Sequence, residues 1–165
     1  MLFKLLLLLP PLVMSVDQEV KYAEFHDAVA KYGYMWEPHE VKTEDGWHLT
    51  MFRITGIDGQ RREEDPNRFP LLMQHGFGES ATSWVEGGVF ERALPLRLFD
   101  QGYDLWLGNN RGMIYSNKND RDGVWSSAER WSWNFADLGK YDIPAQVKGV
   151  LEVTGKEKVT LIGYS

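Results

Sequence analysis

The last ten residues, "KEKVTLIGYS" (156–165), join a charged turn to a short apolar run and a Gly-Tyr-Ser triplet. The run 158–163 is rich in β-branched and aliphatic residues, which is typical of a buried strand in a parallel sheet. The preceding segment, 142–155, has apolar side chains at helical spacing, and it predicts a helix with Asp142 as N-cap and Gly155 at its carboxyl end. A helix that leads into such a strand is half of a parallel crossover unit.

Two earlier segments predict strands of the same kind, "FPLLMQ" (69–74) and "YDLWLG" (103–108). Between them, "ALPLRLFDQG" (93–102) predicts a short helix with Pro95 in its first turn and Gly102 just past its end. Further upstream, "HEVKTEDGWHLTMFRI" (39–54) predicts a β-hairpin, with Asp45-Gly46 as the positive-φ residues of its tight turn. Strands that alternate with helices indicate an α/β fold, with helices on both faces of a mostly parallel sheet.

The composition limits the possible functions. The chain has 165 residues, 43% of them hydrophobic and 13% aromatic, which predicts a packed core. A formal net charge of -6, with no long run of Lys and Arg, gives no reason to expect a nucleic-acid partner. We find no H-E-x-x-H motif, no cysteine and no phosphate-binding glycine loop, so we predict neither a metal nor a cofactor.

The amino terminus, "MLFKLLLLLPPLVMS", has one basic residue, Lys4, before a short apolar stretch. This pattern predicts a secretory signal peptide over residues 1–15. The alternative is a membrane anchor, but a span needs about 20 apolar residues and this stretch is shorter. We therefore expect residues 16–165 to enter the secretory pathway without a transmembrane segment.

The chemistry is expected at the carboxyl ends of the parallel strands, where such sheets bind their ligands. Gly163, Tyr164 and Ser165 match the first three positions of the nucleophile elbow G-x-S-x-G, in which the serine sits on a strained turn after a strand. The triplet alone is common, but its position directly after a predicted strand is the context that the motif requires. Ser165 is therefore the candidate nucleophile.

A second candidate feature is the stretch His75-Gly76-Phe77-Gly78, directly after the strand 69–74. In elbow enzymes, one donor of the oxyanion hole is a backbone N–H in the loop after the third strand. The backbone of Phe77 is the expected donor here. The other donor is the N–H of the residue after the serine, which the chain shown does not include.

Five ordered blocks resemble the acid lipase family of α/β-hydrolases, the group that contains gastric, lingual and lysosomal acid lipases. The resemblance covers the chain from about residue 38 to its last residue. The matching blocks are "VKTEDGWHLTMFRI", "QHGFGESATSWV", "GYDLWLGNNRG" with the later "YS", "WSWNFADLGKYDIPA" and "TGKEKVTLIGYS".

The resemblance implies the amino-terminal part of an α/β-hydrolase fold over residues 16–165, interrupted at the elbow. It implies Ser165 as nucleophile, the backbone of Phe77 as oxyanion donor, and a catalytic Asp and His further downstream. It also implies a neutral-lipid ester substrate bound at an interface, and secretion or residence in the lysosomal lumen. The family commonly has a leucine pair where this chain has Phe77-Gly78, so the acyl pocket is expected to differ.

Several assignments stay open. His75 is expected to shape its loop rather than to act in catalysis, and Arg111 to fix a loop through backbone carbonyls rather than to contact substrate. The aromatic residues Trp125, Trp131, Trp133 and Phe135 are expected to pack a segment onto the sheet, with lipid binding as the alternative.

The end of the chain shown raises further alternatives. In the family the elbow strand lies in the middle of the sheet, whereas in this chain we expect 158–163 to be an unpaired edge. Without a base the 165-residue chain should be inactive. The alternatives to the lipase interpretation are a serine esterase for soluble substrates, a non-catalytic truncated product and an incomplete gene model. The oligomeric state is not predictable.

Overall fold

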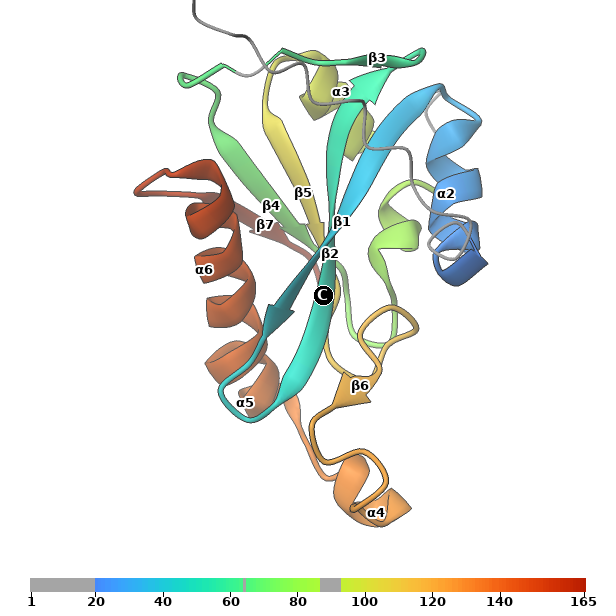
Figure 1. Ribbon diagram of the computed structural model, residues 1–165, viewed down its shortest axis with the longest axis vertical. Coiled ribbons are helices and arrows are strands. Elements are labelled where there is room, and N and C mark those ends of the chain that lie inside the picture. The colour runs from blue at the N-terminus through green and yellow to red at the C-terminus, as the bar shows by residue number, and fades with distance from the viewer. Residues whose placement is uncertain (1–19, 64, 87–92) are drawn as a thin grey trace, which may run out of the picture.

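The computed structural model describes residues 20–63, 65–86 and 93–165, so the predicted signal peptide lies outside the described residues. A sheet runs through the centre of this part of the chain (Figure 1). The strand order is β1 (Tyr34–Lys42), β2 (Trp47–Ile57), β5 (Asp104–Gly108), β4 (Pro70–Gln74) and β7 (Thr160–Gly163), with the short β3 (Gln60–Arg61) and β6 (Lys118–Asn119) also paired to β2. Strands β1 and β2 are antiparallel, β2 is antiparallel to β5, and β5, β4 and β7 are parallel. The α/β class is therefore confirmed.

The hairpin of β1 and β2 is confirmed, but its turn differs from the prediction. Four residues connect the strands, and the Thr43 N–H donates to the Trp47 carbonyl at 2.8 Å. Gly46 has a φ of 91°, whereas Asp45 is not in the left-handed region, so the expected positive φ of Asp45 is wrong. The Asp45 carboxylate instead accepts a 2.6 Å hydrogen bond from the Thr43 hydroxyl, which closes the longer turn without a strained Asp45.

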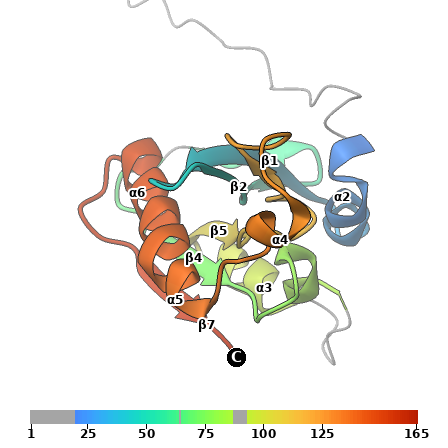
Figure 2. The same ribbon diagram turned by 90° about the horizontal axis from the view of Figure 1, so that it is seen from below.

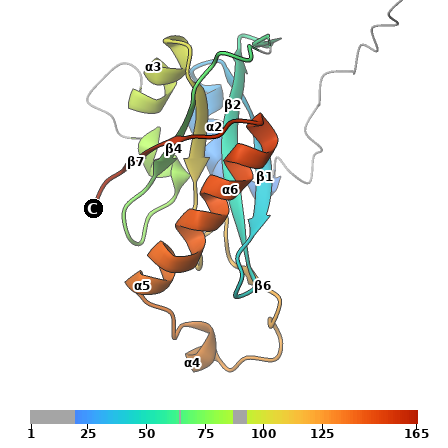
Figure 3. The ribbon, with the colours of Figure 1, turned by 90° about the vertical axis from the view of Figure 1, so that its left-hand side faces the viewer.

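Helices cover both faces of the sheet (Figure 2). The 12-residue helix α6 (Ile143–Thr154) crosses one face, as Figure 3 shows from the side, and packs against Met51, Leu72 and Trp106. The other face carries α2 (Ala23–Ala30), the 3-10 turn η1 (Ala81–Trp84) and α3 (Leu94–Asp100) over a larger aromatic and aliphatic core. The short helix predicted at 93–102 is confirmed as α3, with its proline in the first turn.

The helical segment before β7 begins earlier than predicted. The helix α5 (Phe135–Asp137) starts at Asn134, whose side chain accepts from the Ala136 N–H at 2.8 Å, and a π-turn, η2 (Leu138–Asp142), joins it to α6. Asp142 directly precedes α6 as predicted, but it has helical angles, φ -70° and ψ -52°, and makes no capping hydrogen bond, so its predicted capping role is wrong. Gly155 ends α6 with a φ of 66°, as predicted.

The three predicted parallel strands differ in burial. All residues of β4 and β5 are buried, because each strand has a neighbour on both sides. Strand β7 pairs only with β4 in the described part of the chain, and Leu161 is 44% exposed. The prediction of a buried strand is therefore wrong for β7 in this chain, and the expectation of an edge is confirmed.

Candidate active site

The carboxyl ends of β4, β5 and β7 meet at one edge of the sheet. The connection from β4 to β5 contains α3, which lies on one face of the sheet. The connection from β5 to β7 contains α6, which lies on the other face, and such a change of face leaves a crevice between the strand ends. A cavity of about 360 Å³ lies there. Its lining residues are Gln74, His75, Phe77, Asn110, Phe135, Leu138, Ile143, Gly163, Tyr164 and Ser165.

Ser165 follows β7 with a φ of 62°, in the positive range that few residues other than glycine adopt. Ser165 is exposed at the cavity. Close by, a Cβ added to Gly76 would lie 3.1 Å from the Ser165 Cβ, so only a glycine lets the two strand ends approach this closely without a shift. The structure thus brings together the two stretches that the sequence singled out.

Phe77 lines the same cavity as Ser165. Its backbone N–H makes no hydrogen bond within the described part of the chain, while the turn around it is closed by the Glu79 N–H and the Gly76 carbonyl at 3.3 Å. An unpaired backbone N–H in this place is what an oxyanion donor requires. The Phe77 ring is 54% exposed and lies 4.6 Å, centroid to centroid, from the ring of Phe135.

His75 is buried, and both of its ring nitrogens are occupied. Nε2 accepts from the Asn110 N–H at 3.1 Å, so the proton is on Nδ1, which donates to the Gly76 carbonyl at 2.7 Å. Burial lowers the pKa of His75, and the bond to Gly76 opposes this only in part. A neutral ring with no free nitrogen ties two loops together and cannot serve as a base in this geometry.

The other histidines lie away from the cavity. His39 on β1 contacts Glu37, and His48 on β2 lies between Glu40 and Asp120. His26 on α2 accepts a 3.4 Å hydrogen bond from the Trp36 indole. None of these residues lines the cavity around Ser165.

Asn109, directly after β5, fixes the loop that carries Phe77. Its side-chain oxygen accepts from the Ala81 N–H at 2.8 Å, and its amide group donates to the Thr50 carbonyl on β2 at 2.8 Å. Ser116 ties Asn109 itself to β2, because its hydroxyl donates to the Asn109 carbonyl and accepts from the Thr50 N–H. The sequence analysis missed Asn109 because its partners are 28 and 59 residues away.

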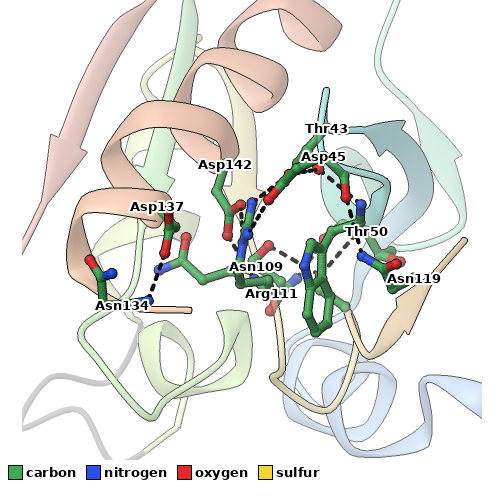
Figure 4. A network of polar contacts seen from close by, with 12 residues as sticks. Thr43, Asp45, Thr50, Asn109, Arg111, Asn119, Asn134, Asp137 and Asp142 are labelled. Atoms are coloured by element: carbon green, nitrogen blue, oxygen red, sulfur yellow. Dashed lines mark hydrogen bonds and ion pairs between the residues drawn. The ribbon is translucent and has the colours of Figure 1, made fainter. Parts of the chain in front are cut away.

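Arg111 holds three segments together (Figure 4). Its side chain is 1% exposed, and its Nε donates to Asp142 at 2.7 Å while Nη1 donates to Asp45 at 2.6 Å. Burial raises the pKa of Asp142, and the bonds and charge of Arg111 reduce that rise. For Asp45, burial is outweighed by hydrogen bonds from Arg111 and Thr43, so the pKa is lowered. The loop-fixing role predicted for Arg111 is confirmed, but the expected carbonyl partners are wrong, because two carboxylates bind it.

The predicted packing of the aromatic segment onto the sheet is wrong for much of it. Trp131 is 50% and Phe135 is 62% exposed, because the segment runs outside the sheet through short polar-capped helices. Four rings form a continuous aromatic rim with centroid distances of 4.6 to 6.4 Å, and two of them, Phe77 and Phe135, line the cavity. The members of this aromatic rim are Phe77, Trp131, Trp133 and Phe135.

The sequence analysis also missed Leu138 and Ile143, which line the apolar side of the cavity. Leu138 lies on the helical extension that begins after Asn134, and Ile143 is the first residue of α6. The signal for that extension was present, because Asn134 and Asp137 have the three-residue spacing of a capping box.

The fold and this site define an α/β-hydrolase. A family model described as alpha/beta hydrolase fold matches residues 70–165, and one described as partial alpha/beta-hydrolase lipase region matches residues 25–88. The chain therefore belongs to the α/β-hydrolase fold family. Among solved structures, an esterase of Pyrococcus furiosus aligns with a TM-score of 0.51 at 18% identity, covering 82% of this chain and 44% of that chain, which supports the fold alone.

Within this family, the curated relatives confirm the resemblance to acid lipases. Gastric triacylglycerol lipase of Rattus norvegicus is 35% identical over 157 residues, covering 94% of this chain and 36% of the relative. Lipase 1 of Drosophila melanogaster is 40% identical over 137 residues, covering 83% of this chain and 29% of the relative. The chain thus spans about a third of the length of the relatives that it matches. Across residues 20–63, 65–86 and 93–165, the structure has no helix that is both long and apolar enough to cross a membrane.

Proposed function

We propose that this chain carries the nucleophile and half of the oxyanion hole of a serine lipase that hydrolyses carboxylic esters of neutral lipids. The observation that carries the proposal is the positive φ of Ser165 at the end of β7, where a Cβ added to Gly76 would lie 3.1 Å from the Ser165 Cβ. A non-glycine residue in this region costs on the order of 1–3 kcal/mol, and such strain is concentrated at functional sites. The relatives named lipases support the same activity.

In the proposed reaction, the Ser165 hydroxyl attacks the ester carbonyl and the alcohol leaves, which gives an acyl-serine that water then hydrolyses. The Phe77 N–H stabilises the oxyanion in both steps, and loss of one such donor lowers kcat by about 10² to 10³. The base is expected from a histidine other than the four described above, because His75 has both nitrogens engaged and the rest lie outside the cavity. Without it, the rate would fall by about 10⁶.

The lining of the cavity favours a lipid over a soluble substrate. Phe135, Leu138 and Ile143 offer an apolar wall opposite the polar ends of the strands. A cavity of this size matches the lower part of the range for small-molecule sites, which are mainly apolar with a few polar groups. The aromatic rim continues this apolar surface from Phe77 and Phe135 to Trp133 and the half-exposed Trp131, which supports binding of an acyl chain near Ser165.

The test is covalent labelling of the protein expressed from its complete coding sequence and secreted from a eukaryotic host. A fluorophosphonate should react once per chain, and Ser165→Ala should abolish the reaction. Labelling that persists in Ser165→Ala would refute the assignment of the nucleophile. Hydrolysis of emulsified triacylglycerol should exceed that of the same concentration of dissolved short-chain ester, and the reverse ranking would favour a soluble-substrate esterase.

The same expression tests the localisation that we propose. The protein should be recovered from the secretory pathway or the medium with its amino terminus near residue 16, as the predicted signal peptide requires. Retention of residues 1–15 on the purified protein would refute cleavage.

A further inference from the structure

Tyr164, the residue before Ser165, reaches back to the loop that follows β4. Its hydroxyl lies 3.1 Å from the Ser83 hydroxyl oxygen. The Ser83 hydroxyl already donates its proton to the Ser80 carbonyl at 2.6 Å, so Tyr164 is the donor and Ser83 the acceptor. The Tyr164 ring meets the Trp84 ring edge-on, with centroids 4.8 Å apart and planes at 89°.

The same ring also contacts the beginning of that loop. A Cβ added to Gly76 would lie 3.0 Å from Cε2 of Tyr164, so the ring packs directly on the glycine backbone. Tyr164 therefore touches both ends of the segment from Gly76 to Trp84. Phe77, which carries the proposed oxyanion donor, lies inside this segment.

The far end of this contact is rigid. Ser83 and Trp84 belong to η1, whose first residues, Ala81 and Thr82, are buried. The Ala81 N–H is held by the Asn109 side chain at 2.8 Å, and the Thr82 hydroxyl lies 2.9 Å from that of Tyr115. A contact to η1 is thus a contact to the core of the sheet.

We propose that Tyr164 is a positioning residue, which fixes the distance between the Ser165 hydroxyl and the Phe77 N–H by fastening the elbow to η1. The proposal rests on the proposed function, because it concerns the geometry of the same reaction. Ser165 is held in a strained conformation, so its hydroxyl stays aligned only if neighbouring contacts oppose relaxation. Oxyanion stabilisation depends on donors that are fixed before the reaction begins, so a loosened elbow lowers the rate rather than the affinity.

The test uses the full-length protein and the variants Tyr164→Phe, Ser83→Ala and the double variant. Tyr164→Phe keeps the ring on Trp84 and Gly76 and removes only the hydroxyl. We expect each single variant to lower kcat for a soluble ester, and the rate constant for fluorophosphonate labelling, by about three- to tenfold, with KM within about twofold. The double variant should be no slower than the slower single variant, because both remove the same bond. The matched control is Tyr103→Phe, because Tyr103 is 38% exposed, like Tyr164 at 39%. Tyr103 directly precedes β5, so it lies at the end of that strand away from the cavity.

The outcomes separate the two proposals. If the wild-type protein reacts with the fluorophosphonate and Tyr164→Phe reacts at the same rate, the positioning role is refuted while the proposed function stands. Multiplying effects in the double variant would also refute it, because they would show that Tyr164 and Ser83 act independently. A wild-type protein that does not react overturns both. If Ser83→Ala fails to fold, as judged by its thermal unfolding, the comparison of Tyr164→Phe with Tyr103→Phe still decides the matter.

Discussion

Replacing Arg111 by methionine should be one of the most destabilising single changes in the chain. The substitution preserves much of the side-chain length but removes the positive charge. The site is fully buried, because the side chain of Arg111 is 1% exposed and that of Asp142 is 0% exposed. Removal of one partner of a buried ion pair costs about 3–5 kcal/mol, because the remaining charge is left without compensation. The partly exposed Asp45, at 31%, can be solvated, so the cost arises mainly at Asp142.

This explanation makes the cost depend on pH. Burial already raises the pKa of Asp142 despite Arg111, and without the arginine the pKa should rise further. A carboxyl whose folded pKa exceeds its unfolded value, about 3.9, stabilises the fold below that value and loses this contribution as the pH rises through the folded pKa. The loss of unfolding free energy in Arg111→Met should therefore be largest near neutral pH and smaller at about pH 5.

The assay is urea unfolding of the full-length protein, followed by tryptophan fluorescence. Arg111→Met with Asp142→Asn should be more stable than Arg111→Met alone by at least about 1 kcal/mol, since the amide removes the unpaired charge. As a control, Arg121→Met, an exposed arginine over the Trp125 ring, should change stability by less than about 0.5 kcal/mol. If Arg111→Met lost less than about 1 kcal/mol of unfolding free energy, or if adding Asp142→Asn restored none of it, the reasoning would be refuted.

Three further predictions concern the site and the hairpin. Gly76→Ala should lower kcat at least about tenfold, because its Cβ would lie 3.1 Å from that of Ser165. The control Gly139→Ala should leave activity unchanged, because beyond its own helical turn no atom lies within 4 Å of the added Cβ; equal kinetics in both variants would contradict the close approach. Phe135→Ala removes one wall of the cavity, so the enzyme should prefer longer acyl chains in a series of p-nitrophenyl esters. An unchanged preference for chain length would show that Phe135 does not contact the acyl chain. Hydrogen bonds to two carboxylates raise the pKa of His48, so its contribution to stability is complete below about pH 6.5 and is lost as the pH rises through the folded pKa. The stability difference between wild type and His48→Gln should therefore shrink from about pH 6 to about pH 8 in thermal unfolding, and a constant difference would refute it.

Features with a local cause could be predicted from the sequence. The apolar runs at 69–74 and 103–108 are short and continuous, and they form the fully buried β4 and β5. Gly155 ends α6 in a left-handed conformation. Such a cap depends only on the residue at that position, so a glycine after a helical pattern predicts it. The strand ends then give the place of the site, because all ligand-binding loops of a parallel sheet follow such ends.

Features with a distant cause could not be predicted. Asp142 reads locally as an N-cap, but its partner is Arg111, 31 residues earlier, and no local pattern contains that pair. The burial of β7 depends on which strands pair with it rather than on its own apolar residues. Phe135 looks like a core residue by type, and only the course of the segment outside the sheet makes it part of the cavity wall.

The precision of the site follows from the register of the strands rather than from the loops alone. Gln74 of β4 pairs with Gly108 of β5 on one side and with Gly163 of β7 on the other, so the three strands end at the same level. The residues just beyond must therefore lie side by side, which places Gly76 against Ser165. A slip of β7 by two residues would keep its side chains on the same faces but move Ser165 by about 6.6 Å, beyond the reach of the Phe77 N–H. The contact of Tyr164 with η1 opposes that slip at a strand that has β4 as its only neighbour in the described part of the chain.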